Sequence, residues 1–328
     1  MDFKSLTQKK AQLDQFRNKG SGLSPALVAN LDDWFRVELT YTSNAIEGNT
    51  LTRQETALVV EKGLTVGGKS LKEHLEATNH ASALDWVRHL VGGRKKTVSE
   101  KDILSIHNLI LKGIDDTNAG HYRDVAVRIS GSNVILPNPI KVPDLMDKFC
   151  RWLKKPLTSH PVEFAAEAHY RLVTIHPFTD GNGRSARLLM NLILLLHGYP
   201  PALIRKSERL PYINSLSKAQ LGGSKEDYLK LMAKAVGRSL DIYLKAIQNE
   251  VTAEPNDDDL IKIGQLAEAA NETVRTIRFW TSEGLLQISD KTASNYALYD
   301  PSCIDRIEKI RALKKERYTL REIREKLD

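Results

Sequence analysis

The sequence predicts a mainly α-helical protein with a helical N-terminal region, a helical core and a small C-terminal domain. Three observations support this fold class. The chain has 328 residues, more than a single hydrophobic core usually serves. Apolar residues recur at helical spacing between glycine-rich breaks along most of the chain. A hydrophobic fraction of 41% with 27% charged residues excludes disorder of the whole chain.

The expected helices start and stop at residues that suit helix ends. Ser24 and Pro25 fit the N-cap and the first helical position of one helix. The run EGN at residues 47–49 then supplies a stop for it. By the same reasoning we expect helices at 5–19, 24–47, 52–62, 70–90, 99–111, 143–153, 161–174, 184–197 and 208 to about 250.

One stretch departs from the helical pattern. Residues 125–129 are rich in β-branched side chains, 130–133 read SGSN, and 134–136 are apolar again. This is the pattern of a strand–turn–strand hairpin, which Pro137 and Pro139 would end. Because the small β-hairpin stands almost alone among helices, we expect its role to be local.

An acidic, proline-containing stretch at 251–259 is predicted to be an exposed linker. It separates residues 260–328, which have their own apolar pattern, from the helical part of the chain that precedes it. The net charge of +7 is mild for this length, so it tolerates nucleic acid as a partner without indicating it.

Cysteine spacing and hydropathy favour a cytoplasmic protein. Cys150 and Cys303 are the only cysteines, and their separation matches no zinc or redox motif. The N-terminal residues lack the apolar segment of a signal peptide. The most apolar stretch, 188–196, is too short to span a bilayer, so no membrane association is expected.

The most informative stretch is HPFTDGNGRSAR at residues 176–187, between two expected helices. Gly181 and Gly183 let the main chain turn sharply and approach a ligand. The N–H groups at the start of the following helix then form an anion site. Arg184 and Arg187 are three residues apart on one helix face, so both can reach phosphate oxygens.

The same stretch also contains a metal ligand and a base. Asp180 offers a carboxylate to Mg²⁺, which needs few protein ligands when phosphates supply the rest. His176 is suited to act as a general base beside the anion site. Each feature alone is common in structural roles, but together they fit attack on a nucleoside-phosphate phosphorus. The stretch is not a Walker A loop, because no Gly-Lys-Ser/Thr follows, and it is not the dinucleotide fingerprint, because no strand is expected before it.

Residues 176–187 resemble the signature H-P-F-x-D/E-G-N-G-R-x-x-R of the Fic/DOC family and meet every fixed position. The resemblance implies a Fic-type helical core at 98–250, preceded by an N-terminal helical region at 1–97. It implies that this core transfers AMP from ATP to a Ser, Thr or Tyr hydroxyl of a protein and releases pyrophosphate. It implies that His176 deprotonates the target and that Asp180 holds Mg²⁺ on the α- and β-phosphates. The remaining residues that it implies are Asn182 with the Gly181 and Gly183 main chain for α/β oxygens, Arg184 for the β-phosphate, Arg187 for the γ-phosphate, Phe178 as a packing anchor, and Tyr212 as an adenine-pocket residue or a core aromatic.

The predicted hairpin also gains a meaning from this resemblance. It is similar to the flap of Fic proteins, whose exposed edge aligns the main chain of the target by strand addition. Val127, Ile129 and Gly131 are the docking residues that this implies. The preceding GHYR at residues 120–123 resembles the segment that leads into the flap.

A second motif, SNAIEGN at residues 43–49, lies at the end of an N-terminal helix. An exposed glutamate there is unfavourable by ~0.3–1 kcal/mol, so Glu47 is expected to have a partner such as Arg187. The stretch resembles the inhibitory S/T-x-x-x-E-G/N motif of Fic proteins, with Ser43, Glu47 and Gly48 at its fixed positions. If Glu47 takes Arg187, the γ-phosphate loses its clamp and the α-phosphorus of ATP is misaligned for attack.

Residues 260–328 resemble the winged helix-turn-helix of MerR-type regulators. The similarity rests on IGQLA at 263–267, TIRFW at 276–280, EGLL at 283–286 and YALY at 296–299. The resemblance places the wing at the last of these runs.

DNA binding by this domain remains one of two readings. Arg275, Arg278 and Lys291 are the candidate phosphate contacts. Ala297 stands where such regulators usually carry arginine, and the sequence stops before their long dimerisation helix. Residues 260–328 contain 13 Lys and Arg against 11 Asp and Glu, so the basic surplus is not concentrated there. A fold kept for protein contacts is the other reading.

The leading hypothesis is an autoinhibited protein adenylyltransferase that uses ATP and Mg²⁺. Within the enzyme class, Glu47 could instead position water for AMP removal, and another phosphate-containing group could be transferred. A third alternative is a DNA-binding regulator whose Fic core is only a nucleotide sensor. The target protein, self-modification and a homodimer all remain open.

Overall fold

The computed structural model describes residues 3–18, 23–93, 97–248, 260–291 and 296–327. It confirms the mainly helical fold class. The chain forms two compact units, Met1–Ile204 with Asn214–Ala253, and Arg205–Ile213 with Glu254–Asp328. The predicted domain boundaries stay predictions, and the expected linker at 251–259 lies outside the described residues. No helix within the described ranges has both the length and the hydropathy that a membrane crossing requires.

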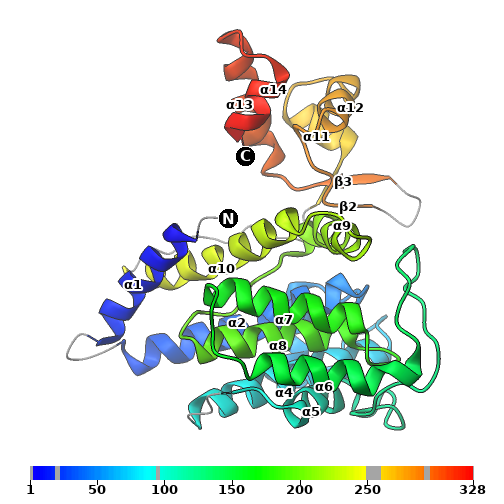
Figure 1. Cartoon of the computed structure of the whole chain (residues 1–328). Helices are drawn as coiled ribbons and strands as arrows, with labels where there is room; N and C mark the ends of the chain where they lie inside the picture. Colours follow the sequence, from blue (N-terminus) through cyan, green and yellow to red (C-terminus); the bar gives the residue numbers. More distant parts are fainter. Residues whose placement is uncertain (1–2, 19–22, 94–96, 249–259, 292–295, 328) are drawn as a thin grey trace. The chain divides into compact units, whose positions relative to one another are not determined.

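The first unit is helical throughout its described elements (Figure 1). Its helices agree with the expected positions to within a few residues except after residue 208. They are α1 (Lys4–Asn18), α2 (Pro25–Ile46), α3 (Arg53–Lys62), α4 (Leu71–Gly92), α5 (Glu100–Leu111), the 3-10 turn η1 (Pro139–Lys141), α6 (Val142–Leu153), α7 (Pro161–Ile175), α8 (Asn182–Leu196) and α10 (Glu226–Ile247), with α9 (Arg209–Gln220) starting in the second unit and ending in the first.

Helix α8 lies at the centre of the first unit, packed against α7, α4, α5 and α2 (Figure 1). Its sequence is apolar almost all round, and a helix of that kind is stable only when other helices cover every face. The N-terminus of α8 follows directly after the loop 176–181. The four helices that enclose α8 therefore also supply the surroundings of that loop.

Helix α2 brings the second motif to the same place. Its start is as expected, because the Ser24 side chain accepts a hydrogen bond from the Leu27 N–H and Pro25 follows at the first position. Its end is also as expected, because Gly48 has φ 99°, which glycine adopts without strain. The carboxylate of Glu47 is thereby left at the C-terminal end of α2.

The expectation of one continuous helix from 208 to about 250 is wrong. The segment between α9 and α10 is a turn at residues 221–225. Gly222 has φ 90°, and a β-carbon on Gly223 would lie 2.8 Å from the Lys218 carbonyl oxygen. Both positions therefore need glycine to end α9, and this local requirement outweighs the helical periodicity on either side.

The prediction of a paired β-hairpin at 125–136 is wrong as well. Figure 1 shows this segment as a long hairpin-shaped loop, but no strand is assigned to any residue of 121–138. A single hydrogen bond from the Ser132 N–H to the Ile129 carbonyl closes its tip. A two-stranded hairpin is only marginally stable in water unless a third strand or a helix packs against it. Among the described residues no third strand pairs with either arm of this segment, so β-branched residues alone do not hold the arms in a ladder.

Among its described residues, the second unit contains a small antiparallel sheet, four complete helices and the start of α9. The sheet has the order β1-β3-β2, with Ile261 paired with Tyr299 and Lys291 paired with Ala297. Its core is a cluster that includes Ile277 and Trp280. The elements are the 3-10 turn η2 (Lys206–Glu208), β1 (Ile261–Lys262), α11 (Ile263–Ala269), α12 (Val274–Ser282), β2 (Asp290–Lys291), β3 (Ala297–Tyr299), α13 (Cys303–Lys315) and α14 (Leu320–Leu327).

Candidate active site

His176 terminates α7 in a left-handed conformation, with φ 50° and ψ 60°. Its Nδ1 lies 3.3 Å from the Val173 carbonyl oxygen. A proton on Nδ1 makes this a hydrogen bond and leaves the Nε2 lone pair free to accept a proton. Burial lowers the pKa of His176 from its ordinary value, so the ring is neutral near pH 7. The geometry is that of a general base.

The loop after His176 is closed by its own side chains. Asn182 accepts a hydrogen bond from the Phe178 N–H at 3.0 Å and donates one to the Phe178 carbonyl at 2.8 Å. The side chain of Asn182 therefore shapes the loop, and its contact with phosphate stays a prediction. Gly181 has φ 72°, and a β-carbon there would press against His107 and Ile110. Glycine is required at 181 on both grounds.

His107, on α5, supports this loop from below. Its ring stacks on Phe178 with a centroid distance of 3.6 Å and an interplanar angle of 4°. Its Nε2 lies 3.0 Å from the Asp180 carbonyl oxygen, and its Nδ1 accepts the Gly120 N–H at 2.9 Å. These two bonds require the neutral tautomer with the proton on Nε2. Burial lowers the pKa of His107 to about 4, which keeps that tautomer in place.

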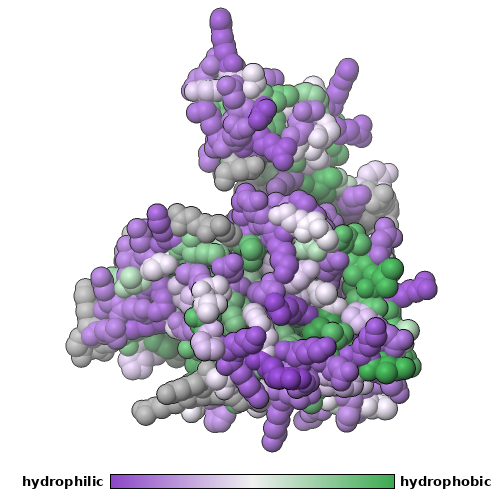
Figure 2. Space-filling view, viewed as in Figure 1, coloured by the Kyte–Doolittle hydropathy of each residue, from purple (hydrophilic) through white to green (hydrophobic). Residues whose placement is uncertain are grey.

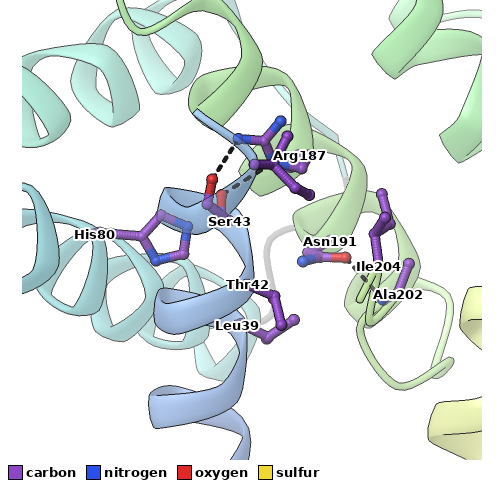
Figure 3. Close-up of a pocket in the computed structure, with 9 residues that line it drawn as sticks. Leu39, Thr42, Ser43, His80, Arg187, Asn191, Ala202 and Ile204 are labelled. Atoms are coloured by element: carbon purple, nitrogen blue, oxygen red, sulfur yellow. Dashed lines mark hydrogen bonds between the residues drawn. The ribbon is translucent and has the colours of Figure 1, made fainter. Parts of the chain in front are cut away.

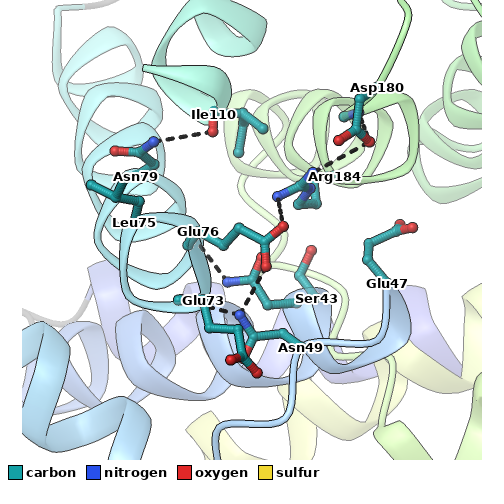
Figure 4. A network of polar contacts seen from close by, with 12 residues as sticks. Ser43, Glu47, Asn49, Glu73, Leu75, Glu76, Asn79, Ile110, Asp180 and Arg184 are labelled. Atoms are coloured by element: carbon teal, nitrogen blue, oxygen red, sulfur yellow. Dashed lines mark hydrogen bonds and ion pairs between the residues drawn. The ribbon is translucent and has the colours of Figure 1, made fainter. Parts of the chain in front are cut away.

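Arg184 lies in the first turn of α8 and is almost completely buried. Its Nη1 is 3.1 Å from Oε1 of Glu76 on α4, and its Nη2 is 3.5 Å from Oδ1 of Asp180 (Figure 4). Glu76 in turn accepts a hydrogen bond from Asn49, just after the second motif. The Nε atom of Arg184 has no hydrogen-bond partner among the described residues. A buried donor of this kind is suited to an anion that the site would bind.

Arg187, one turn further along α8, is held by the end of α2 (Figure 3). Its Nε donates to the Ser43 hydroxyl at 2.9 Å, and its Nη2 donates to the Ser43 carbonyl at 2.9 Å. The same Nη2 lies 2.7 Å from Oε1 of Glu47. With its side chain only 5% exposed, Arg187 is in contact with both predicted inhibitory side chains.

The Glu47 carboxylate also lies over the anion site. A β-carbon on Gly183 would overlap Oε1 of Glu47 and lie 3.1 Å from Nη1 of Arg187. The space above the first turn of α8 is therefore occupied by a negative charge. A phosphate approaching the helix N-terminus would meet that charge and find Arg187 already engaged.

Two buried histidines, His80 and His169, lie close enough to Arg187 for its positive charge to lower their pKa values. His80 lies beside Ser43 and Arg187 in the lining of a small pocket (Figure 3), and its Nδ1 is 3.1 Å from the Thr40 hydroxyl. Burial, with a smaller effect of Arg187, lowers the pKa of His80 and of His169 to about 3. Both rings are neutral at physiological pH, so Arg187 is the cation that pairs with the Glu47 carboxylate, and neither histidine competes for it.

The donor set fits Mg²⁺ bound together with ATP. The Asp180 side chain is half exposed at the mouth of the loop. Searched over the described ranges, the chain has no cluster of three or more His, Cys, Asp or Glu that could cage a metal. A single carboxylate is sufficient when phosphates and water complete the octahedron. The unpartnered Nε of Arg184 supplies a donor for those phosphates.

The structure brings most of the predicted residues together. His176, the loop and both signature arginines share one site with the motif 43–49. The flap residues Val127, Ile129 and Gly131 lie on the loop that replaces the predicted hairpin, and their docking role stays a prediction. Tyr212 is buried on α9 within the second unit, so its adenine contact also stays a prediction. In the second unit, Arg275 and Arg278 on α12 and Lys291 on β2 are exposed.

Sequence reasoning missed the residues that hold the motif from other helices. Glu76, His107 and Arg123 all contact the signature loop or its arginines. Arg123 belongs to the GHYR run, which the sequence predicts as the segment leading into the flap without assigning a role to Arg123 itself. At Glu76 and His107 the sequence shows only a glutamate and a histidine within a helical pattern. Such a residue gives little indication of a functional role unless the group that it contacts is known.

Two family models match the chain. Residues 97–194 match the Fic/DOC family, and residues 261–328 match the MerR HTH family regulatory protein. Among curated proteins, the protein adenylyltransferase Fic of Nematostella vectensis is 41% identical over 206 residues, which are 62% of this chain and 48% of that protein. The chain spans about half the length of the curated relatives it matches.

The fold of this chain is also similar to solved structures of Fic proteins. The structure of Fic-1 (residues 134–508) from C. elegans is similar with a TM-score of 0.68 and 32% identity, covering 76% of this chain and 73% of that one. A Fic domain containing signaling protein from Bacteroides thetaiotaomicron has a TM-score of 0.66 and 30% identity, covering 76% of this chain and 99% of that one.

Proposed function

Because this chain belongs to the Fic/DOC family and carries a MerR-type helix-turn-helix domain, we propose that it is an autoinhibited protein adenylyltransferase. In this proposal AMP passes from ATP to a Ser, Thr or Tyr hydroxyl of a protein. The new bond joins the hydroxyl oxygen to the α-phosphorus, the bond from that phosphorus to the β-phosphate oxygen breaks, and pyrophosphate leaves. The names of the curated relatives support the activity.

The residues of the site divide this chemistry between them. His176 accepts the hydroxyl proton at Nε2, because its Nδ1 faces the Val173 carbonyl. Arg184 and the first-turn N–H groups of α8 bind the phosphates and orient the α-phosphorus for in-line attack. Mg²⁺ bound at Asp180 would offset the charge on the α- and β-phosphates. Phe178 and Asn182 keep the loop rigid, so the base and the phosphate site stay in register.

The observation that carries the autoinhibited form is the contact of Arg187 with both Ser43 and Glu47. In this arrangement Arg187 is not available to the γ-phosphate. The Glu47 carboxylate also fills the space over Gly183 where phosphate oxygens would approach. ATP can then bind only with its terminal phosphate displaced, which moves the α-phosphorus away from the line of attack.

Mass spectrometry of the Glu47→Gly protein tests donor and reaction together. The protein is incubated with ATP and Mg²⁺ and then digested, and the peptides are searched for an added AMP on a hydroxyl side chain. GTP, CTP and UTP in parallel incubations separate nucleotide classes, and ATP labelled on the α- or γ-phosphate separates AMP transfer from phosphate transfer. Label arriving only from the γ-position would contradict the proposal.

Removal of AMP is a second candidate because Glu47 also faces the base. Burial lowers the pKa of His176 and the negative charge of Glu47 partly opposes this, so the carboxylate acts on the ring, and in this second proposal it orients a water beside it. An AMP-modified protein incubated with wild type and with Glu47→Gly separates the two roles. Faster loss of AMP with wild type supports AMP removal, and no loss with either contradicts it.

We also propose that the helix-turn-helix domain binds DNA through exposed cations. Arg275 and Arg278 lie on the outer face of α12, whose inner face packs Ile277 and Trp280 into the domain core. Mobility shifts of a random-sequence duplex by the full chain, at low and moderate salt, test this. The double variant Arg275→Ala with Arg278→Ala should weaken binding and reduce the salt dependence. No shift by wild type at either salt would contradict DNA binding.

A further inference from the structure

One buried guanidinium connects the flap to the main chain of the general base. Arg123 donates from Nε to the His176 carbonyl at 2.8 Å, from Nη1 to the Val125 carbonyl at 2.9 Å, and from Nη2 to the Pro137 carbonyl at 2.6 Å. Its own N–H donates to the Pro177 carbonyl at 2.9 Å. The planar fork of arginine is the side chain that can satisfy three carbonyls in one plane.

Val125 and Pro137 lie on opposite arms of the flap, one near each end of the loop. No backbone hydrogen bond joins the two arms within residues 124–137, apart from the one at the tip that closes on Ile129. The two bonds from Nη1 and Nη2 therefore take the place of a strand ladder at the base of the loop. Without them the arms would be joined only through their tip.

The outer surface of the flap carries apolar side chains that nothing in the first unit covers. Ile135 is 95% exposed and Val125 is 52% exposed, and Ile140 on the adjoining turn η1 is 85% exposed. Figure 2 shows hydrophobic residues gathered on the surface around this loop. A loop that is to accept a target strand must hold its two arms at a fixed spacing before the target arrives, because ordering them on binding would weaken the complex.

We propose that Arg123 is a positioning residue, which fixes both arms of the flap to the main chain of His176 and so aligns a docked target hydroxyl with the base. The proposal rests on the proposed function and deepens it. Arg123 touches neither ATP nor the reacting atoms. It acts through the two loops that must meet when a target hydroxyl is brought to the ring.

The burial of Arg123 supports this role over a general structural one. Its side chain lies in a residue that is 3% exposed, and its guanidinium hydrogen bonds within the described residues all go to main-chain carbonyls. A buried cation without a carboxylate is expensive, and burial lowers the pKa of Arg123. Lysine or glutamine at this position could not reach both arms and His176 at once.

The test uses Arg123→Met and Arg123→Lys in the Glu47→Gly chain, with Arg151→Met as a matched control on an exposed face of α6. Three quantities are measured: the affinity for ATP by calorimetry, the rate of AMP transfer with the Glu47→Gly chain itself as the acceptor probe, and the rate of tryptic cleavage after Arg128. Arg128 is an exposed residue of the flap, so cleavage there reports its order without any reference to activity.

We expect Arg123→Met to slow AMP transfer at least tenfold and to speed cleavage after Arg128 about tenfold, with ATP affinity within twofold of the parent. Arg123→Lys should give intermediate values of both rates, and Arg151→Met should change neither. Rates of transfer and cleavage within twofold of the parent for Arg123→Met would overturn the proposal. So would an equal loss of ATP affinity and transfer in both Arg123 variants, which indicates a structural role only.

The two hypotheses can fail separately. A Glu47→Gly parent that binds ATP and transfers no AMP to any acceptor removes the proposed function, while the cleavage assay still decides whether Arg123 orders the flap. If Arg123→Met does not fold, Arg123→Lys carries the test, because it retains the charge and loses only the fork. Unchanged cleavage after Arg128 in a folded Arg123→Lys chain would overturn the proposal.

Discussion

Oε1 of Glu47 lies 2.7 Å from Nη2 of Arg187, where the second motif meets the signature helix. The two residues are 140 positions apart in the sequence, with Glu47 at the C-cap of α2 and Arg187 within α8. A charge-assisted hydrogen bond of this kind contributes about 1.5–3 kcal/mol. That range is sufficient to set whether Arg187 serves the carboxylate or a phosphate.

Glu47→Gly is expected to raise AMP transfer by about tenfold or more, because about 1.4 kcal/mol corresponds to a factor of ten. The variant frees Arg187 and removes the negative charge above Gly183. Labelled ATP with wild type and variant measures the change. Glu61→Gly, an exposed substitution on α3, is the control. Equal labelling by wild type and Glu47→Gly would remove the inhibitory role from Glu47.

Ser43→Ala should release Arg187 in part. The Ser43 hydroxyl accepts the Nε–H of Arg187, and an unsatisfied buried donor costs about 1–3 kcal/mol. The Ser43 carbonyl and Glu47 still hold the guanidinium, so we expect a rise of about threefold to tenfold, below that of Glu47→Gly. Ser82→Ala on the exposed face of α4 serves as the matched control. A lower rate in Ser43→Ala than in wild type would contradict this account.

His176→Ala should abolish transfer in wild type and in the Glu47→Gly chain, because it removes the ring nitrogen that accepts the hydroxyl proton. The base must be neutral, and burial lowers the pKa of His176. Activity should therefore persist below pH 6.5 and fall only as the pH drops through that lowered pKa. Glu47 raises the pKa of His176, so its removal should move the acid limb lower still. A pH–rate profile of kcat/KM measures this, and an acid limb above pH 6.5 would argue against it.

His107→Phe should weaken turnover about tenfold although His107 contacts no substrate. Phenylalanine can keep the stack on Phe178, but it leaves the Asp180 carbonyl and the Gly120 N–H without their partners. We expect weaker binding of Mg²⁺, measured as a higher Mg²⁺ concentration for half-maximal AMP transfer in the Glu47→Gly chain. His89→Phe, on the exposed side of α4, should leave that concentration unchanged.

The sequence was sufficient to predict most helices and the two motifs, because helix ends and motif spacing depend on residues that are close together in the sequence. Caps such as Ser24 with Pro25 and stops such as Gly48 act within a few residues, and so does the spacing of the signature. The turn at Gly222 was missed because helical periodicity continues on both sides of it. The flap was predicted as a paired hairpin from its β-branched residues, but pairing also needs a neighbouring strand or helix.

The partners of the signature could not be predicted for a different reason. Glu76 on α4 and His107 on α5 are far from residues 176–187 in the sequence. They come close to the signature only when α4 and α5 pack against α8. Neither residue has a spacing that points to a ligand. Only Glu47 gave a signal, because a glutamate at a helix C-terminus is unfavourable unless something compensates it. The contact of Glu47 with Arg187 agrees with that expectation.

The buried histidines predict how stability changes in acid. In the folded protein the pKa of His80 and of His169 is about 3, against about 6.5 for an unfolded chain. Below pH 6.5 the unfolded chain therefore binds more protons than the folded one, and stability is lost as the pH falls toward 3. Each histidine should lower the free energy of unfolding by about 1.4 kcal/mol per pH unit over that range.

His80→Asn tests this because asparagine does not titrate there and can still face the Thr40 hydroxyl. We expect the variant to be less stable than wild type at pH 7, where the imidazole packing is lost. The gap should then narrow by about 1.4 kcal/mol for each pH unit between 6 and 4.5, because one proton-uptake site is gone from the unfolded chain. Urea unfolding at several pH values measures both chains, with His89→Asn as the exposed control. A parallel decline in wild type and His80→Asn would show that His80 is already protonated in the folded protein.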